Sequence, residues 1–160
     1  MRVLLIDQDE RLLLFQDSDR GLDPIALWWM TPGGGVDSGE ADPRAAAREV
    51  HEETGLVVAE GDLIGPLATR TVIHGFSDVI TVQDEVFWAV RCPSFAIDTS
   101  GHTADEQASI TAHRWWSRAE LAATEDTFWP ADLLGLWDLA DTPPTEPIDQ
   151  GTIEESTVPA

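Results

Sequence analysis

Residues 33–56, GGGVDSGEADPRAAAREVHEETGL, constrain the fold of this 160-residue chain more than any other stretch. Three consecutive glycines open the segment, and Asp42 with Pro43 forms a credible helix start, with Asp42 as the N-cap. Gly55 is a suitable stop, so residues 43–54 are predicted to form a helix. The segment also holds four glutamates, two of them adjacent, which places dense negative charge on and beside a short helix.

Three of these glutamates, Glu49, Glu52 and Glu53, project from one side of the predicted helix, within an arc of roughly 100°. Carboxylates at these spacings repel one another and destabilise a bare helix. Most glutamate-rich helices are solvated surfaces, but here a bound divalent cation would offset the repulsion. Because the candidate ligands are all oxygens, Mg²⁺ or Mn²⁺ is favoured over zinc. The nearby glycines and helix N-terminus add N–H groups that suit phosphate, so the stretch indicates substitution at phosphorus.

The overall charge limits the partners of the chain. Nine arginines, no lysine and 30 acidic residues give a formal net charge of -21. This balance argues against non-specific binding to nucleic acid or anionic membranes. No apolar stretch approaches the length of a membrane span, and the first residues lack the features of a signal peptide. We therefore expect a cytoplasmic protein whose partner is a small molecule; the sequence does not choose between a monomer and a homodimer.

Alternating apolar runs predict a chain of mixed strands and helices. Ser117 and Glu120 form a capping box that opens a second helix, and Pro130 precedes a third. Such a mixture is typical of an α+β fold or a mixed α/β sandwich. The predicted strands are residues 3–6, 11–16, 27–30, 63–73, 79–90 and 111–116, the third helical stretch is 131–140, and 98–107 is a polar loop.

The last twenty residues differ in composition from the rest of the chain. Residues 141–160 are acidic, contain several prolines and lack aromatic residues. This composition predicts a tail that is flexible or draped over the surface. Residues 1–140 are accordingly predicted to form a single domain.

The glutamate spacing matches a known signature. Gly34, five residues, Glu40, seven residues, and then the run REVHEETGL from Arg48 to Leu56 resemble the complete Nudix box of the Nudix hydrolase superfamily at every fixed position. The layout of the flanking strands and late helix is similar to that of a Nudix domain over roughly residues 1–140. The resemblance implies an α/β/α sandwich with a mixed β-sheet, in which the box forms a loop–helix–loop.

The resemblance also implies an activity. Family members are pyrophosphohydrolases that use Mg²⁺ or Mn²⁺ to cleave a nucleoside diphosphate linked to another moiety, which includes (deoxy)nucleoside triphosphates. Arg48 would orient a box glutamate, Glu40 would support the site, and Glu52 would be a further metal ligand or the base that activates water. The implied metal ligands are Glu49, Glu53, Glu52 and the carbonyl of Gly33, and the implied catalytic residues are Glu52, Glu53, Arg48 and Glu40.

Outside the box, five residues are candidate substrate contacts. Trp28 and Trp29 precede the glycines, and alternation along a strand would turn one to the core and the other to a cleft. Trp29 is the candidate for stacking on a nucleobase. The others are Arg70, His74 and Phe76, which could contact a phosphate or base, and Glu106, which could be the additional acidic residue that family members often recruit from a later loop.

Two alternative functions use the same fold. One is a nucleotide-binding regulatory module, and the other is an isoprenoid-diphosphate isomerase that uses a cysteine. Cys92 is the only cysteine and is predicted to be a small buried hydrophobe. Subclass markers downstream of the box do not identify the substrate. Pro66 comes too early to be the proline associated with ADP-ribose hydrolases, and the chain has no tyrosine to match the one associated with dinucleoside polyphosphate hydrolases.

Overall fold

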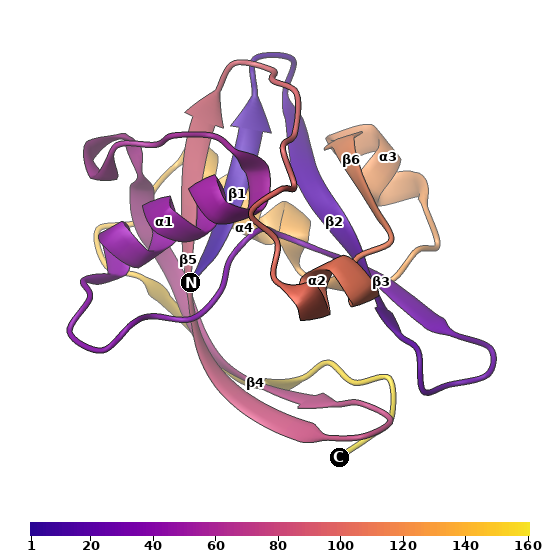
Figure 1. Cartoon of the computed structure of the whole chain (residues 1–160). Coiled ribbons are helices and arrows are strands. Elements are labelled where there is room, and N and C mark those ends of the chain that lie inside the picture. The colour runs from indigo at the N-terminus through magenta and orange to yellow at the C-terminus, as the bar shows by residue number, and fades with distance from the viewer.

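Strict alternation of apolar residues builds the central strand. β1 (Arg2–Asp7) buries Val3 and Leu5 on one face of the sheet and Leu4 and Ile6 on the other. The structure, a computed structural model that describes residues 1–160, places this strand between an antiparallel and a parallel neighbour (Figure 1). These neighbours are β2 (Arg11–Asp19) and β5 (Ile80–Cys92).

The sheet has eight strands in the order β7-β3-β2-β1-β5-β4-β8, with β6 paired to β2. It is mixed, because the β1–β5, β3–β7 and β4–β8 pairs are parallel and the others are antiparallel. The remaining strands are β3 (Ala26–Met30), β4 (Ile64–Gly75), β6 (Ala112–Ser117), β7 (Phe128–Trp129) and β8 (Ile148–Glu154).

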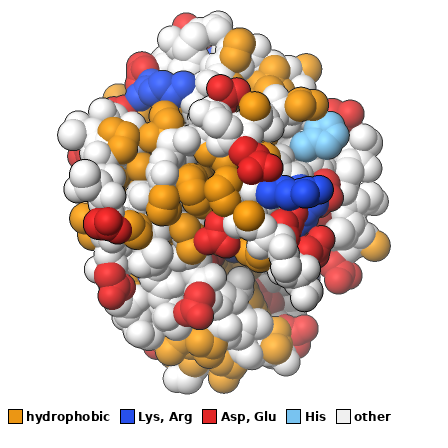
Figure 2. Space-filling model, turned by 90° about the vertical axis from the view of Figure 1, so that its left-hand side faces the viewer, with side chains coloured by type: hydrophobic (Ala, Val, Ile, Leu, Met, Phe, Trp, Pro, Cys, Tyr) orange, Lys and Arg blue, Asp and Glu red, His pale blue; other side chains and the backbone are white.

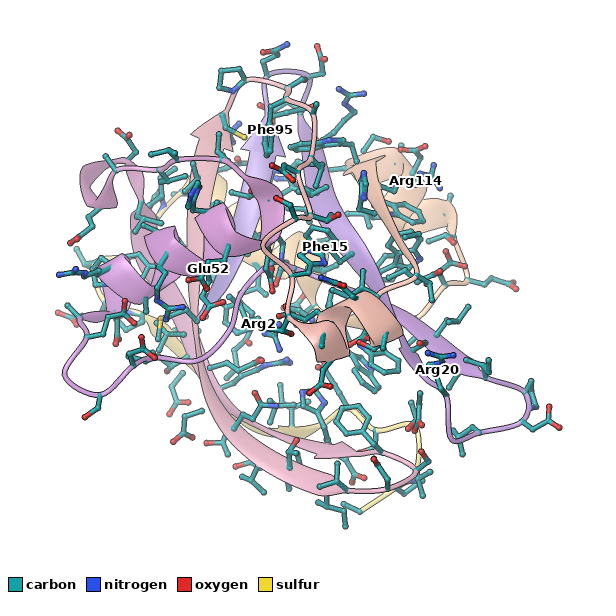
Figure 3. All side chains as sticks on the ribbon, in the orientation of Figure 1. Arg2, Phe15, Arg20, Glu52, Phe95 and Arg114 are labelled. Carbon is teal, nitrogen blue, oxygen red and sulfur yellow. The ribbon has the colours of Figure 1, made fainter.

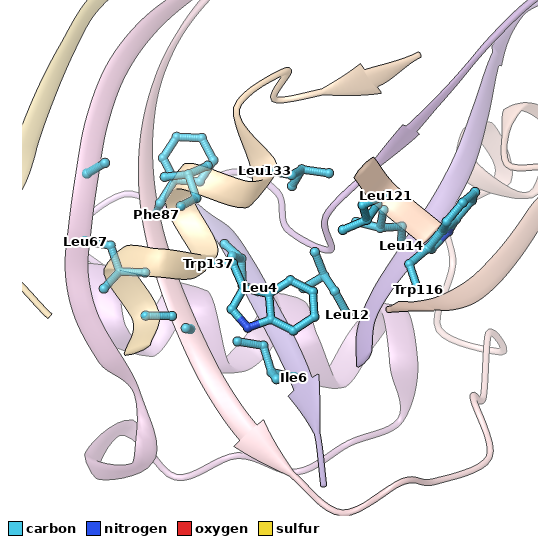
Figure 4. Close-up of a cluster of buried hydrophobic side chains, with 14 of the residues drawn as sticks. Leu4, Ile6, Leu12, Leu14, Leu67, Phe87, Trp116, Leu121, Leu133 and Trp137 are labelled. Atoms are coloured by element: carbon cyan, nitrogen blue, oxygen red, sulfur yellow. The ribbon is translucent and has the colours of Figure 1, made fainter. Parts of the chain in front are cut away.

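Helices cover both faces of the sheet. α1 (Asp42–Thr54) packs Ala46 and Val50 against Val3 and Leu5. On the opposite face, α3 (Arg118–Ala123) and α4 (Leu133–Asp141) contribute to the larger core, with Trp137 against Leu4, Ile6 and Leu12 in Figure 4. Figure 1 shows α1 in front of the sheet and α4 behind it. The prediction of an α+β fold with an α/β/α arrangement is therefore confirmed.

Most predicted elements are present, with small shifts at their ends. α1 begins one residue earlier than predicted, so Ala41 rather than Asp42 is the N-cap, and Pro43 lies in the first turn. The Ser117 capping box is confirmed. The predicted polar loop at 98–107 is partly wrong, because α2 (Ala104–Ser109) begins within it behind a second capping box, formed by Thr103 and Glu106. A short 3₁₀ helix, η1, spans Glu60–Asp62.

The segment that follows α4 is not a flexible tail, because part of it forms an edge strand of the sheet. β8 pairs in parallel with β4, and the N–H groups of Thr157 and Val158 donate to the carbonyl of Gly75. Glu155, just after β8, is buried and forms an ion pair with Arg70 at 2.8 Å. The composition is typical of a solvated tail, but pairing with a sheet edge and with a buried arginine depends on residues far away in the sequence.

The two halves of the sheet separate at the start of β1. Arg2 is the first residue of β1 and pairs with Phe87 in β5. Beyond this point β2–β3 continues as one pair and β4–β5 as another, and Figure 1 shows β4 and β5 curving away. The space between these extensions positions the candidate site described below. None of the helices has the length and apolar character needed to cross a bilayer.

Candidate active site

Helix α1 turns two of its glutamates toward the sheet. Glu49 and Glu53 are 8% and 7% exposed, whereas the side chain of Glu52 is 49% exposed. Residues four apart lie on the same side of a helix, so the first two carboxylates share the inner side. Figure 3 shows Glu52 extending from α1. Of the three glutamates predicted to share one arc of the helix, Glu49 and Glu53 are therefore buried and Glu52 is half-exposed.

The glycine loop lies directly against the buried pair. The N–H of Gly33 donates to Oε2 of Glu53 at 2.9 Å. A Cβ atom at Gly34 would overlap the carboxylate of Glu49, and one at Gly33, where φ is +148°, would overlap the backbone of Met1. Glycine at both positions lets the loop fit between α1 and the start of β1. The role of the Gly33 carbonyl as a metal ligand stays a prediction.

Arg48 ties this loop to the helix. Its Nε and Nη2 donate to the carboxylate of Glu40 at 3.0 and 2.8 Å. Its Nη1 donates to Glu49 at 2.7 Å and to Glu52 at 3.1 Å, and Nη2 also donates to the carbonyl of Gly35. Arg48 lowers the pKa of Glu40 to about 2, so Glu40 stays ionised. The geometry suits the positioning roles that the box implies for Arg48 and Glu40.

The buried carboxyl groups are electrostatically unfavourable by themselves. Burial raises the pKa of Glu53 to about 8, although the hydrogen bond from Gly33 acts in the opposite direction. Burial also raises the pKa of Glu49, against the effect of Arg48. A cation bound between the two would stabilise both ionised forms.

The donor set fits a hard divalent cation, because it consists of carboxylate and backbone oxygens. No three His, Cys, Asp or Glu side chains converge on one point in the structure. Glu49 and Glu52 are instead turned to Arg48, and Glu53 is turned to Gly33.

Two adjoining cavities lie in the cleft between the halves of the sheet. The first, of about 160 Å³, is lined by Glu53, Gly33 and Glu106 among others. The second, of about 180 Å³, is lined mainly by side chains of β3, β4, β5 and β7. Both are lined by Arg2, Asp17 and Met30. The three shared residues place the two cavities side by side.

Four aromatic rings surround the second cavity. Trp28 and Trp129 are stacked with ring centroids 4.3 Å apart, and His74 and Phe76 are stacked at 5.6 Å. They come from β3, β4, the residue after β4, and β7. Flat aromatic side chains of this kind suit a planar ligand group such as a nucleobase.

Four of the five candidate substrate contacts line these cavities. Arg70, His74 and Phe76 line the second cavity, and Glu106 lines the first together with Glu53. Glu106 also caps α2, where its carboxylate accepts hydrogen bonds from Thr103. The structure thus brings together residues that are far apart in the sequence.

The prediction that Trp29 contacts substrate is wrong. Trp29 lies in the core against Trp116, with ring centroids 5.1 Å apart, and its Nε1 donates to Asp126 at 3.0 Å. Trp28 faces the cavity instead. Alternation along β3 correctly predicts one tryptophan on each side, but pairing with β2 decides which, and two adjacent tryptophans give no indication of that register.

Several lining residues were not indicated by their local sequence. Trp129 reaches the cavity because β7 pairs with β3, and Arg2 does so because β1 begins where the sheet divides. Glu85 follows Gln83 and Asp84 in the polar middle of β5, so the local sequence does not set it apart either. It is 3% exposed, and its ion pairs with Arg2 and Arg70 measure 2.8 and 2.7 Å.

Cys92 behaves as a core residue. Burial raises the pKa of its thiol to about 11. We expect the native thiol to react with dithionitrobenzoate at mildly alkaline pH at least roughly tenfold more slowly than the thiol of the chain unfolded in guanidinium, because the thiolate is the reactive form. Equal rates in the two states would contradict the burial of Cys92. The absorbance of the released thionitrobenzoate measures both rates.

Comparisons with known proteins agree with this geometry. A family model described as the NUDIX domain matches residues 1–136. The chain is 36% identical over 61 residues to the uncharacterized Nudix hydrolase YvcI of Bacillus subtilis, a match that covers 38% of this chain and 35% of the relative. It is 51% identical over 37 residues to the 8-oxo-(d)GTP phosphatase of Mycolicibacterium smegmatis, covering 23% of this chain and 12% of the relative. The matches thus span about a third or less of the curated relatives.

Solved structures share the fold at low sequence identity. The Escherichia coli dihydroneopterin triphosphate pyrophosphohydrolase has a TM-score of 0.60 at 22% identity, covering 88% of this chain and 92% of that chain. A MutT protein from Bacillus halodurans has a TM-score of 0.59 at 18% identity, covering 98% and 88%. The intact box, the shared fold and a family model that matches most of the residues lead to one conclusion: this chain belongs to the Nudix family.

Proposed function

We propose that this protein is a pyrophosphohydrolase that cleaves the diphosphate linkage of a nucleoside diphosphate derivative or a (deoxy)nucleoside triphosphate by attack of water on phosphorus. The observation that carries the proposal is the pair of adjoining cavities, which connects the buried carboxylate of Glu53 to a set of stacked aromatic rings. A nucleotide has the matching chemistry, with an anionic diphosphate at one end and a planar base at the other.

We propose Mg²⁺ or Mn²⁺ as the cofactor, held by Glu49, Glu53 and Glu52 with the carbonyl of Gly33 as a further ligand. When bound, such an ion neutralises charge on the diphosphate and lowers the pKa of coordinated water. The residues fit this role, since burial of Glu49 and Glu53 disfavours their ionised forms until a cation offsets them.

Other residues of the box hold these groups in place. Arg48 bridges Glu40 of the loop to Glu49 and Glu52 of the helix, which fixes the loop against α1. Glu52 is half-exposed, so its carboxylate is open to water and can accept a proton from it. We therefore assign the base to Glu52, with Glu53 as the alternative because it lines the cavity itself.

The aromatic cavity is proposed to bind the group attached to the diphosphate. Trp28, Trp129, His74 and Phe76 offer ring faces, and Asp17 and Gln83 offer polar groups at the same cavity. Two similar proteins are named for triphosphates with fused-ring groups, a dihydroneopterin triphosphate pyrophosphohydrolase that shares the fold and an 8-oxo-(d)GTP phosphatase that matches over 37 residues. Fused-ring triphosphates are therefore the first substrates to test.

A substrate panel tests the proposal. It contains the common and 8-oxo purine triphosphates, pyrimidine triphosphates, dihydroneopterin triphosphate, ADP-ribose, nucleotide sugars, dinucleoside polyphosphates and coenzyme A. We expect hydrolysis of at least one member, with loss of activity in EDTA and recovery on adding Mg²⁺ or Mn²⁺, because two buried carboxylates need a cation. Release of phosphate or pyrophosphate is measured. No hydrolysis with either metal, despite tight nucleotide binding by calorimetry, would favour a regulatory module instead.

A further inference from the structure

The cleft needs positive charge of its own. The formal net charge is -21, and Figure 2 shows a face over which acidic side chains are spread while arginines are few. An anionic substrate that enters the cleft is repelled by this surface. Only two of the nine arginines, Arg2 and Arg70, line the two cavities. The structure distinguishes sharply between them.

Arg70 is held in the wall by two carboxylates. Its Nε donates to Oε2 of Glu85 at 2.7 Å, and its Nη2 donates to Oε2 of Glu155 at 2.8 Å. The side chain is 2% exposed, and its guanidinium lies 5.3 Å from the ring centroid of Phe87. Two carboxylates already offset its charge, so Arg70 supports the cavity without being free to bind an anion.

Arg2 pairs with one carboxylate rather than two and is more exposed than Arg70. Its Nε donates to Oε1 of Glu85 at 2.8 Å, and its Nη1 reaches the carbonyl of Thr31 only at 3.5 Å, the outer limit of a hydrogen bond. Its Nη2 has no hydrogen-bond partner among the protein contacts, and 14% of the side chain is exposed. A guanidinium carries five N–H groups in a planar fork, so most of this fork is available to a ligand.

The position of Arg2 matches the diphosphate. It lines both cavities, so it lies where the carboxylate end and the aromatic end of the cleft meet. Figure 3 shows Arg2 in the middle of the molecule, between α1 and the curved β4–β5 pair. Its charge is also felt at Glu53, where it opposes the dominant effect of burial on the pKa.

We infer that Arg2 binds a phosphate group of the substrate and thereby holds the diphosphate between the glutamates of α1 and the aromatic cavity. This inference rests on the proposed function. Glu85 positions the fork of Arg2, and Arg70 and Glu155 position Glu85 in turn, through a continuous chain of ion pairs. Arginine suits this task better than lysine, since its fork can donate two hydrogen bonds to one phosphate.

Arg2→Gln tests the inference with a nucleotide that the wild-type protein hydrolyses and with inorganic pyrophosphate as a competitive inhibitor. We expect KM for the nucleotide and the inhibition constant of pyrophosphate to rise together by roughly 10- to 100-fold, because a charge-assisted contact is lost. Arg2→Lys should recover part of the loss as a point charge. Arg91→Gln is the matched control, since Arg91 pairs with Glu10 and Asp141 outside the cleft and should leave both constants unchanged.

A second variant separates binding from stability. Arg2→Gln leaves Glu85 with Arg70 as its remaining partner and lowers the melting temperature to some extent. The double variant Arg2→Gln with Glu85→Gln also removes the carboxylate that has lost one of its two arginines, and it should keep the weakened pyrophosphate inhibition. Unchanged KM and unchanged inhibition in either folded variant would overturn the role of Arg2. A wild-type protein that hydrolyses nothing in the panel would overturn the proposed function itself. That result differs from an active wild type whose Arg2 variants keep the same KM and inhibition, which would overturn only the role of Arg2.

Discussion

Glu53→Gln is expected to lower kcat by roughly two to four orders of magnitude, the range lost when a catalytic carboxylate is removed. Glu53 is the box glutamate that lines the cavity, and the N–H of Gly33 already holds one of its oxygens. Glutamine has nearly the same shape, but it lacks the charge that would hold a cation or accept a proton. Initial rates at saturating Mg²⁺ with any hydrolysed nucleotide measure the loss.

Glu60→Gln is the control, because Glu60 is an exposed acid of η1 outside the Nudix box and should leave kcat unchanged. Loss of folding would not account for an inactive Glu53→Gln. Burial raises the pKa of Glu53 above its unfolded value, so in metal-free protein this group costs stability as pH rises from about 4.5 to about 8. The glutamine variant should therefore melt no lower than the wild type near pH 8. Near-normal kcat in both Glu53→Gln and Glu52→Gln would contradict the assignment of the active site.

Glu155→Gln is expected to lower the free energy of unfolding by about 3–5 kcal/mol, the cost of breaking a buried ion pair by removing one partner. Glu155 is 5% exposed, and its carboxylate accepts hydrogen bonds from Arg70 and from the N–H of Ala131, both at 2.8 Å. Glutamine can keep some of these contacts but leaves the charge of Arg70 only partly offset. Urea unfolding of the full chain, followed by tryptophan fluorescence, measures the change.

The adjacent residue supplies a matched control. Glu154 is exposed, so Glu154→Gln should change stability by no more than about 0.5 kcal/mol. If Glu155→Gln and Glu154→Gln unfold at the same urea concentration, the segment after α4 does not unfold together with the rest of the sheet. Such a result would restore the tail that composition alone predicts.

The sequence predicts best the features that depend on neighbouring residues. The box helix, its glycine stop, the Ser117 capping box and the apolar strand at residues 3–6 all follow from local spacing, and the structure has each of them. The same local rules would also have found α2, because Thr103 and Glu106 repeat the pattern of Ser117 and Glu120.

The features that the sequence misses depend on pairing over long distances. Arg70 and Glu155 are 85 positions apart, so neither indicates that the other will offset its charge. Which of Trp28 and Trp29 faces the cavity follows from the register of β3 on β2, a choice made by the whole sheet. The glutamates of α1 are thus encoded locally in one helix, whereas the aromatic cavity is assembled from six strands.

The chain of ion pairs from Arg2 through Glu85 and Arg70 to Glu155 also has a consequence for the newly made protein. A ribosome completes α1, with its glutamates, roughly 100 residues before it reaches Glu155, which corresponds to about 5–20 s of synthesis. During that interval the nascent chain has the glutamates of α1 but lacks Glu155, the partner of Arg70 in the wall of the cavity. The wall of the cavity should therefore be complete only after Glu155 has been synthesised, when β8 can pair with β4.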